Sequence, residues 1–369
     1  MGSGRTARVV REAVRLIEAG VAGNVFPGAV GCVAWRESGA WAYAEAAGGR
    51  LAHQAPKAEP KTIYDLASIT KSFVATTALR LVESGRLSLS STVHATLSDA
   101  RGGAVDQVTI EQLLTHRSGL AAWGGLYLDV PHDPGSSAAR RWILAEAARR
   151  PEEGPPGRCV YSDLGYMLVG EIVARAAGSD LAEAVADHVT RPLGIDDVVM
   201  YAGALSSERR AALVRVAAPT ERCQWRGRIV RGEVHDENCS ALGGVSGHAG
   251  LFGTARGVAR FGTELLDVLA TRSTFLSKAT LEAALAERPG GSYRLGFDVK
   301  TGEQSAAGRR MSARTFGHLG FTGTSFWCDP EQEIVVVLLT NRVHPSRANE
   351  KIRGFRPAFH DGVLAAWEG

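Results

Sequence analysis

The segment Thr62-Ile63-Tyr64-Asp65-Leu66-Ala67-Ser68-Ile69-Thr70-Lys71-Ser72-Phe73-Val74 passes from a strand-like to a helical pattern, and the fold prediction starts from it. Apolar residues at helical spacing continue to Val82, and Gly85 ends the helix. Ser68 and Lys71 are three positions apart near the start of this helix, so they share one face. A lysine in a partly dry site can lose its proton and activate a serine hydroxyl, and backbone N–H groups at a helix start can bind an oxyanion. The segment therefore predicts a nucleophilic serine and its base.

Lysine is rare in this chain, which has six Lys and 36 Arg. Arginine keeps its proton in proteins, whereas lysine can release it. The pattern Ser-x-x-Lys occurs once, at the junction of a predicted strand and a predicted helix, where an exposed nucleophile is expected. The same pattern also fits an exposed lysine that follows a serine by chance.

The composition is that of an ordinary globular protein with enough length for a large core. The 369 residues are 45% hydrophobic and 22% charged, with a formal net charge of +3. No dense basic run occurs, so neither nucleic acid nor an anionic membrane surface is an expected partner. The longest strongly apolar run, 334–339, is too short to span a bilayer.

The N-terminal region and the cysteines indicate a cellular compartment. Residues 5–18 mix apolar residues with Arg and Glu in a helical pattern and contain no apolar core of a signal peptide, which predicts a cytoplasmic protein. The opening Met-Gly-Ser-Gly is also typical of an expression tag. The five cysteines are scattered and contain no Cys-x-x-Cys, so we expect free thiols and neither a disulfide framework nor a zinc site.

Predicted strands lie at both ends of the chain, and predicted helices lie between them. The pattern favours an α+β fold, in which one antiparallel sheet of N- and C-terminal strands is flanked by helices and carries a mostly helical insert. We expect a discontinuous sheet domain (1–88 and 231–369), a helical domain (89–230), and an active site at their seam. The expected strands are 29–35, 40–44, 293–299, 315–318, 324–328 and 333–340, and a last helix is expected at 358–367.

A second candidate group is Tyr161-Ser162-Asp163, which follows a Pro/Gly loop and begins a helix. A tyrosine phenol near a lysine can act as a general base or acid with a lowered pKa. Alternatively, Ser162 or Asp163 only caps the helix and Tyr161 packs.

A third candidate is the glycine-rich run from Phe316 to Thr324. Glycines in a strand allow a ligand or a second backbone to approach closely. His318 could donate to the substrate or to Tyr161, and the N–H of Phe321 could join the N–H of Ser68 in an oxyanion hole. A structural histidine is the alternative interpretation.

Other short motifs in the sequence give weaker indications of an active site or a metal site. Lys300-Thr301-Gly302 matches an active-site triplet, but a polar turn follows it. His235, Asp236 and His248, with His318, could serve a metallohydrolase, yet their spacing matches no metal motif, so no metal is expected. Gly-x-Ser-x-Gly, Gly-x-Gly-x-x-Gly and a phosphate-binding loop are missing from the sequence, so no cofactor is expected.

The ordered set Ser68-Ile-Thr-Lys71, Tyr161-Ser-Asp163 and His318-Leu-Gly320 resembles the serine β-lactamase and penicillin-binding-protein superfamily, in its class C-like branch. That branch includes family VIII carboxylesterases, D-aminopeptidases and penicillin-binding-protein-4-like hydrolases. The likeness runs from about residue 25 to 345 and implies a β-lactamase/transpeptidase-like fold. Further similar stretches are 113–120, 192–195, 234–236, 243–250, 321–323 and 340–342.

The resemblance implies a catalytic role for each motif residue. Ser68 would be the acylated nucleophile, and Lys71 would keep it reactive and shuttle its proton. Tyr161 would act as base in acylation and help to activate water in deacylation. His318 stands where class C β-lactamases have a lysine, and the N–H groups of Ser68 and Phe321 would hold the oxyanion.

The resemblance also implies substrate contacts at Asp163, Gly320 and Thr322, and two of the motifs depart from the family pattern. Asp163 replaces an asparagine that donates to the substrate's acylamido carbonyl, and an ionised carboxylate cannot donate. His318 replaces a fixed cation that pairs with a substrate carboxylate, and histidine is mostly neutral at pH 7. Asp163 could instead attract a substrate ammonium.

These departures predict a serine hydrolase that forms an acyl-enzyme with small esters or amides, with weak β-lactam turnover. The alternatives are a β-lactamase, a D-Ala-D-Ala carboxypeptidase or a D-aminopeptidase. A catalytically inactive binding protein on the same fold is a further alternative. In each case the expected partner is a small-molecule ester, amide or β-lactam.

Overall fold

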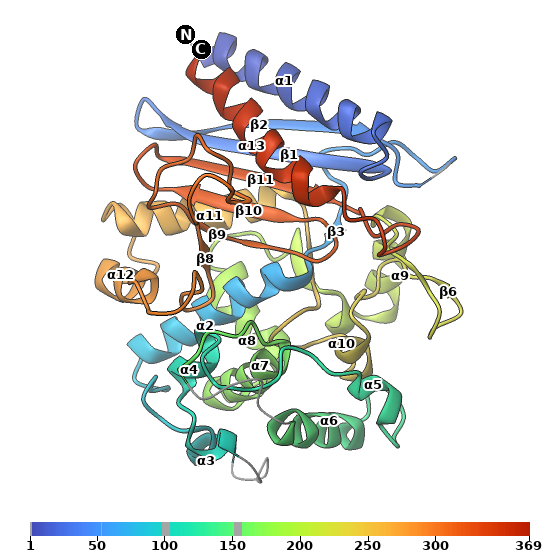
Figure 1. Cartoon of the computed structure of the whole chain (residues 1–369), viewed down its shortest axis with the longest axis vertical. Helices are drawn as coiled ribbons and strands as arrows, with labels where there is room; N and C mark the ends of the chain where they lie inside the picture. The colour runs from blue at the N-terminus through green and yellow to red at the C-terminus, as the bar shows by residue number, and fades with distance from the viewer. Residues whose placement is uncertain (1, 53, 98–103, 151–156) are drawn as a thin grey trace.

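The computed structural model describes residues 2–52, 54–97, 104–150 and 157–369, and combines helices with antiparallel sheets (Figure 1). The larger helices are α1 (Gly2–Ala22), α2 (Thr70–Glu83), α6 (Ser137–Arg149), α7 (Asp163–Ala177), α9 (Ser207–Val216), α11 (Ala255–Leu269), α12 (Lys278–Leu285) and α13 (Ile352–Glu368). The short helices are α3 (Val93–Thr96), α4 (Ile110–Leu114), α5 (Leu126–Asp129), α8 (Leu181–Val185) and α10 (Glu237–Ala241), with the helical turns η1 (Ala67–Ile69), η2 (Ala104–Gln107), η3 (Ala186–Thr190) and η4 (Ala202–Ala204). The strands are β1 (Gly28–Glu37), β2 (Ala40–Gly49), β3 (Tyr64–Asp65), β4 (Val199–Tyr201), β5 (Arg222–Cys223), β6 (Arg228–Ile229), β7 (Leu251–Gly253), β8 (Asp298–Val299), β9 (Phe316–Leu319), β10 (Ser325–Asp329) and β11 (Ile334–Thr340).

The predicted antiparallel sheet is confirmed. Within the described ranges it has six strands in the order β2-β1-β11-β10-β9-β8, so the N-terminal hairpin pairs with the C-terminal strands through β1 and β11. The hairpin turns at Ser38 and Gly39, which both have positive φ, as a two-residue turn of this twist requires.

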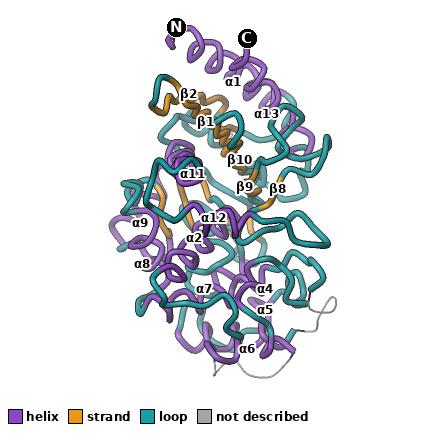
Figure 2. The backbone as a smooth tube through the Cα atoms, turned by 90° about the vertical axis from the view of Figure 1, so that its left-hand side faces the viewer, coloured by secondary structure: helices purple, strands orange, loops and turns teal. Residues whose placement is uncertain are grey.

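Helices cover both faces of this sheet. α1 and α13 lie together on one face, and α11 lies on the other (Figures 1 and 2). Alternate residues of the strands enter two cores: Val33 and Val336 pack toward α13, whereas Cys32 and Val337 pack toward α11. The central strands are therefore apolar on both faces.

The middle of the chain is largely helical, as predicted, and packs below the sheet around α2 and α7 (Figure 2). A small sheet, β3-β7-β4, joins the segment before Ser68 to residues from the middle of the chain. The domain boundaries inferred from the sequence remain a prediction.

Several elements differ from the predictions. β2 continues to Gly49 instead of ending at residue 44, and the short strands β4, β5, β6 and β7 lie in regions where the sequence predicts no strand. Of the strand expected at 293–299, the structure forms only Asp298–Val299. Gly296 has positive φ and lies so close to Ala75 of α2 that a β-carbon would clash, and its carbonyl accepts a hydrogen bond from Ser72. The segment is thus a loop fixed against α2. The last helix begins at Ile352 rather than 358, because Pro357 is accommodated within it.

Candidate active site

Ser68 lies in the helical turn η1, between β3 and α2, as the sequence pattern predicts. The preceding Ala67 adopts positive φ, an unfavourable conformation for alanine that directs the chain sharply into the helix. The buried Asp65 holds this bend: its Oδ1 accepts from the N–H of Ala67 at 2.8 Å, and its Oδ2 accepts from the N–H of His235 at 2.6 Å. Ser68 is therefore presented on a strained, tethered turn.

Lys71 is fully buried below Ser68. Its Nζ lies 3.1 Å from Ser68 Oγ, 2.6 Å from Asp163 Oδ1 and 3.2 Å from the carbonyl of His248. Burial lowers the pKa of Lys71, and the Asp163 carboxylate opposes that shift without cancelling it. The lysine is thus a candidate base for the serine, and Asp163 regulates its basicity.

Tyr161 precedes α7, whose first turn is capped by Ser162. The Nζ of Lys71 lies 4.8 Å from the centre of the Tyr161 ring, over its face. Burial and the charge of Asp163 raise the pKa of Tyr161 well above its usual value, although a hydrogen bond with Ser68 opposes this. The lowered tyrosine pKa expected from the sequence is therefore wrong: the phenol keeps its proton in the free enzyme.

His116 supports Tyr161 from behind, a role that the sequence analysis missed. Its ring lies 4.5 Å from that of Tyr161 and 4.9 Å from those of Tyr166 and Tyr293, and its Nδ1 accepts from the N–H of Ser162. Burial and the nearby Lys71 hold the pKa of His116 well below its usual value, so the imidazole is neutral.

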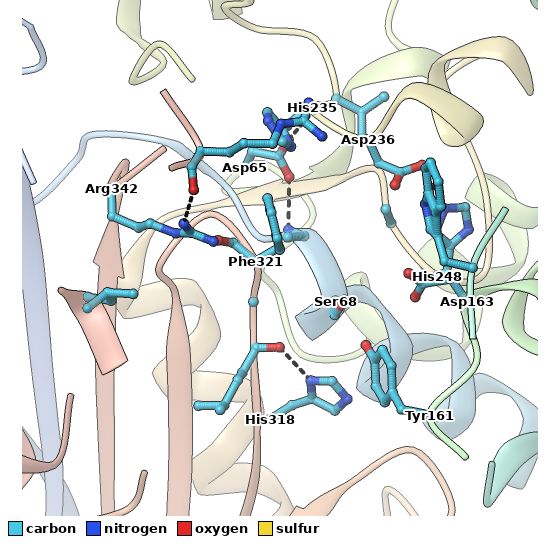
Figure 3. A pocket seen from close by; sticks show the side chains of 18 of the residues that line it. Asp65, Ser68, Tyr161, Asp163, His235, Asp236, His248, His318, Phe321 and Arg342 are labelled. Carbon is cyan, nitrogen blue, oxygen red and sulfur yellow. Dashed lines mark hydrogen bonds and ion pairs between the residues drawn. The ribbon is translucent and has the colours of Figure 1, made fainter. Parts of the chain in front are cut away.

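His318 faces Tyr161 from β9, with ring centres 6.2 Å apart (Figure 3). Its Nδ1 lies 2.7 Å from the carbonyl of Leu319 and donates to it, which leaves Nε2 as an acceptor. Burial and the charge of Lys71 lower the pKa of His318 to about 3. The third motif thus supplies a neutral ring and no cation.

The turn after β9 is tied to the segment before the nucleophile. Thr322 Oγ1 donates to the carbonyl of Asp65 at 2.8 Å, and Thr324 Oγ1 donates to that of Leu66 at 3.1 Å. Among the described residues, no protein acceptor is found for the N–H groups of Ser68 and Phe321. The free donor of Phe321 on this turn and the free donor of Ser68 in η1 suit an oxyanion hole.

The 232–253 segment forms one wall beside Ser68. His248 Nε2 lies 2.8 Å from Asp236 Oδ1, and His248 Nδ1 lies 2.9 Å from Ser246 Oγ. Burial disfavours the charged form of Asp236, yet His248 holds the pKa of this carboxyl well below its usual range. His235 bonds Glu221 at 2.9 Å and stacks on the ring of Phe321 at 5.6 Å. Within the described ranges, no group of three or more His, Cys, Asp and Glu is arranged to hold a metal ion.

The site contains a cavity of about 610 Å³, bordered by the motif residues and by part of the 232–253 segment (Figure 3). Of the predicted site residues, the lining contains the following: Ser68, Tyr161, Asp163, His318, Gly320 and Phe321. Lys71 lies below the floor and reaches Ser68 from there. Thr322 is buried and bonded to Asp65, so the structure places it behind the wall and not in the lining.

Other lining residues had no signal in the sequence analysis. Trp123 and Tyr293 come from loops, and Arg356 comes from α13. The triplet Lys300-Thr301-Gly302 is not in the lining. The Nζ of Lys300 donates instead to the carbonyls of Arg309 and Met311.

None of the helices in the described part of the chain has the length and apolar content to cross a membrane.

Comparison with known proteins agrees with this geometry. The model of the family described as Beta-lactamase matches residues 13–356, so the chain belongs to that family. The N-acetylmuramyl-L-alanine amidase of Bacillus subtilis (strain 168) is 29% identical over 370 residues, covering 92% of this chain and 82% of that protein.

Solved structures share the fold. EstCE1, a hydrolase with promiscuous acyltransferase activity, superposes with a TM-score of 0.75 at 21% identity, covering 97% of this chain and 99% of EstCE1. A penicillin-binding protein homologue from Caulobacter crescentus gives a TM-score of 0.73 at 22% identity, covering 98% and 97%. The resemblance predicted from the three motifs is confirmed, and the protein is a serine hydrolase of the β-lactamase-related type.

Proposed function

We propose that the protein hydrolyses small esters or amides with an uncharged acyl group through an acyl-enzyme on Ser68. The observation that carries this proposal is the 3.1 Å approach of Lys71 Nζ to Ser68 Oγ on the floor of the cavity. The neutral state of His318 supports the choice of substrate, because the third motif then offers no charge to a substrate carboxylate.

In the proposed mechanism, Lys71 in its neutral form takes the proton of Ser68 as Oγ attacks the carbonyl carbon. The N–H groups of Ser68 and Phe321 bind the oxyanion. As the bond to the leaving group breaks, the Tyr161 phenol donates its proton to that group. Lys71 lies over the ring face, so the proton that it took from Ser68 returns to Tyr161 through water admitted to the cavity. A water molecule then attacks the acyl carbon, the same groups move its proton, and Ser68 is released.

The raised pKa of Tyr161 supports the role of proton donor for this residue over that of phenolate base. The ion pair of Lys71 with Asp163 is a second reason to expect poor β-lactam turnover, since the carboxylate cannot donate to an acylamido carbonyl. Asp163 instead serves the base.

Substrate panels test this proposal. We expect kcat/KM for p-nitrophenyl butyrate to exceed the value for a chromogenic cephalosporin and for D-Ala-p-nitroanilide by at least ~100-fold, because each mispaired polar group costs about 1–3 kcal/mol. A preference for the cephalosporin would identify a β-lactamase instead. A preference for D-Ala-p-nitroanilide would identify a D-aminopeptidase, with Asp163 and Asp236 facing the substrate amine.

A further inference from the structure

Residues 207–231 gather exposed apolar side chains outside the active site. Of the seven large apolar side chains that are exposed in the described part of the chain, four belong to this stretch: Val214, Val216, Trp225 and Ile229. Exposed apolar residues that lie this close together in the chain are candidates for contact with a partner. The stretch, called here the 207–231 surface, comprises α9, the β5–β6 hairpin and the residues that join them.

The 207–231 surface is also strongly basic. It contains seven arginines and two glutamates, with no lysine and no aspartate, so its local charge exceeds the +3 of the whole chain. Five of the arginines are exposed: Arg209, Arg210, Arg215, Arg222 and Arg228. The near-neutral charge of the whole chain conceals this local excess, which is why composition alone predicted no anionic partner.

Hydrogen bonds join the β5–β6 hairpin to α9, and a ring contact joins the hairpin to α5. Arg231 donates to the carbonyls of Ala217 at 2.8 Å and Arg215 at 2.9 Å, which ties the hairpin to the end of α9. Trp225 packs on Tyr127 of α5, with ring centres 5.0 Å apart. Figure 1 shows α9 and β6 beside each other at the edge of the molecule, away from the six-stranded sheet.

The surface continues to the mouth of the cavity. Tyr127 lies 6.5 Å from the ring of Trp123, which is half exposed and belongs to the cavity lining. A partner bound to the 207–231 surface would therefore lie next to the entrance of the active site.

We infer that the 207–231 surface binds an anionic lipid surface. Arginines pair with lipid phosphates, tryptophan favours the boundary between headgroups and acyl chains, and valine and isoleucine enter the apolar layer. A second copy of this chain fits less well, because a symmetric contact would bring two strongly basic patches together. Nucleic acid would use the arginines and Trp225, but it would leave the aliphatic side chains uncovered.

Vesicle co-sedimentation tests this inference. We expect the full-length protein to bind vesicles of equimolar phosphatidylcholine and phosphatidylglycerol, to bind pure phosphatidylcholine far less, and to dissociate as salt is raised. In the variant R209Q/R215Q/R222Q the partition coefficient falls by ~100-fold, since each arginine contributes about fivefold. The variant I229S, which keeps every charge, also binds the anionic vesicles more weakly.

A matched control separates this surface from net charge. R11Q/R141Q/R314Q removes three exposed arginines elsewhere and is expected to bind vesicles almost as the wild type does. Both triple variants keep the rate of ester hydrolysis, because none of these arginines lies in the cavity lining.

Several results would overturn the inference. The inference fails if the wild type does not sediment with the anionic vesicles, or if the two triple variants lose vesicle binding to the same extent. If light scattering shows that the wild type is a dimer and that R209Q/R215Q/R222Q is a monomer, the surface binds a second copy of the chain. Binding of a single-stranded oligonucleotide without binding of vesicles would assign it to nucleic acid.

Discussion

Replacing Asp163 by asparagine changes the charge next to the proposed base while it keeps the shape of the side chain. Lys71 Nζ lies 2.6 Å from Asp163 Oδ1, and the asparagine oxygen can accept the same hydrogen bond. The carboxylate opposes the effect of burial, so its removal lowers the pKa of Lys71 further. More of the lysine is then neutral at a given pH.

The expected consequence is a shift of the rising limb of kcat/KM toward lower pH. An opposite charge at this distance changes a proton equilibrium by roughly tenfold or more. Below the limb, kcat/KM for p-nitrophenyl butyrate therefore rises by about tenfold or more in D163N. Above the limb it falls slightly, because a weaker base transfers the proton less readily.

The assay is a pH–rate profile of wild type, D163N and E350Q, read at the isosbestic wavelength of p-nitrophenol. Glu350 is a matched control, since it also lines the cavity but pairs with Arg353. We expect E350Q to keep the wild-type limb. A limb that stays in place in D163N, or that moves to higher pH, would refute the assignment of Lys71 as the base.

Three further substitutions test residues in and around the site. In D65N, one of the two oxygens that accept from the N–H groups of Ala67 and His235 is replaced by an amide nitrogen, which cannot accept. We therefore expect kcat for p-nitrophenyl butyrate to fall ~10–100-fold with little change in KM. A change confined to KM would contradict this. S162A removes the cap of α7 and should lower the free energy of unfolding in urea by about 1–2 kcal/mol, and an unchanged midpoint would show the cap to be dispensable. Burial lowers the pKa of His318 to about 3 in the folded protein, below the pKa of about 6.5 of an unperturbed histidine, so wild-type stability is lost as pH falls through that window, by up to about 1.4 kcal/mol per pH unit. H318Q should lose this part of the slope, and equal slopes of unfolding free energy against pH in the two proteins would argue against a buried neutral ring.

Local patterns in the sequence predict most of the main sheet and the Ser68–Lys71 pair, whereas the roles of Tyr161 and His318 follow only from the resemblance to the β-lactamase superfamily. The strands around Val33 and Val336 are short apolar runs bounded by turn residues, and the helices at 163–177 and 255–269 follow 3.6-residue periodicity. Ser68, Tyr161 and His318 line one cavity, as the order of the motifs implies.

No local sequence pattern identifies the residues that hold these site residues in place. Asp65 bonds His235 across 170 positions, and His116 bonds Ser162 across 46 positions, so only the folded chain brings them together. The sequence predicts a strand around Gly296, because the contact of this residue with α2 leaves no local pattern in the sequence.

The direction of the Tyr161 pKa also depended on geometry. A lysine close to a phenol oxygen lowers its pKa. Here burial raises the pKa of Tyr161, Asp163 adds negative charge nearby, and Lys71 lies over the ring face. The resemblance places the three residues near each other, yet it does not say which atoms meet.

The central claim is that Ser68 carries the acyl group, and intact-protein mass spectrometry tests it most directly. Wild type and S68A are incubated with p-nitrophenyl butyrate and, separately, with a fluorescent penicillin, and are then quenched in acid. We expect a butyryl adduct on wild type alone, with rapid release and little penicilloyl adduct. Equal labelling, or equal turnover, of wild type and S68A would show that Ser68 is not the nucleophile.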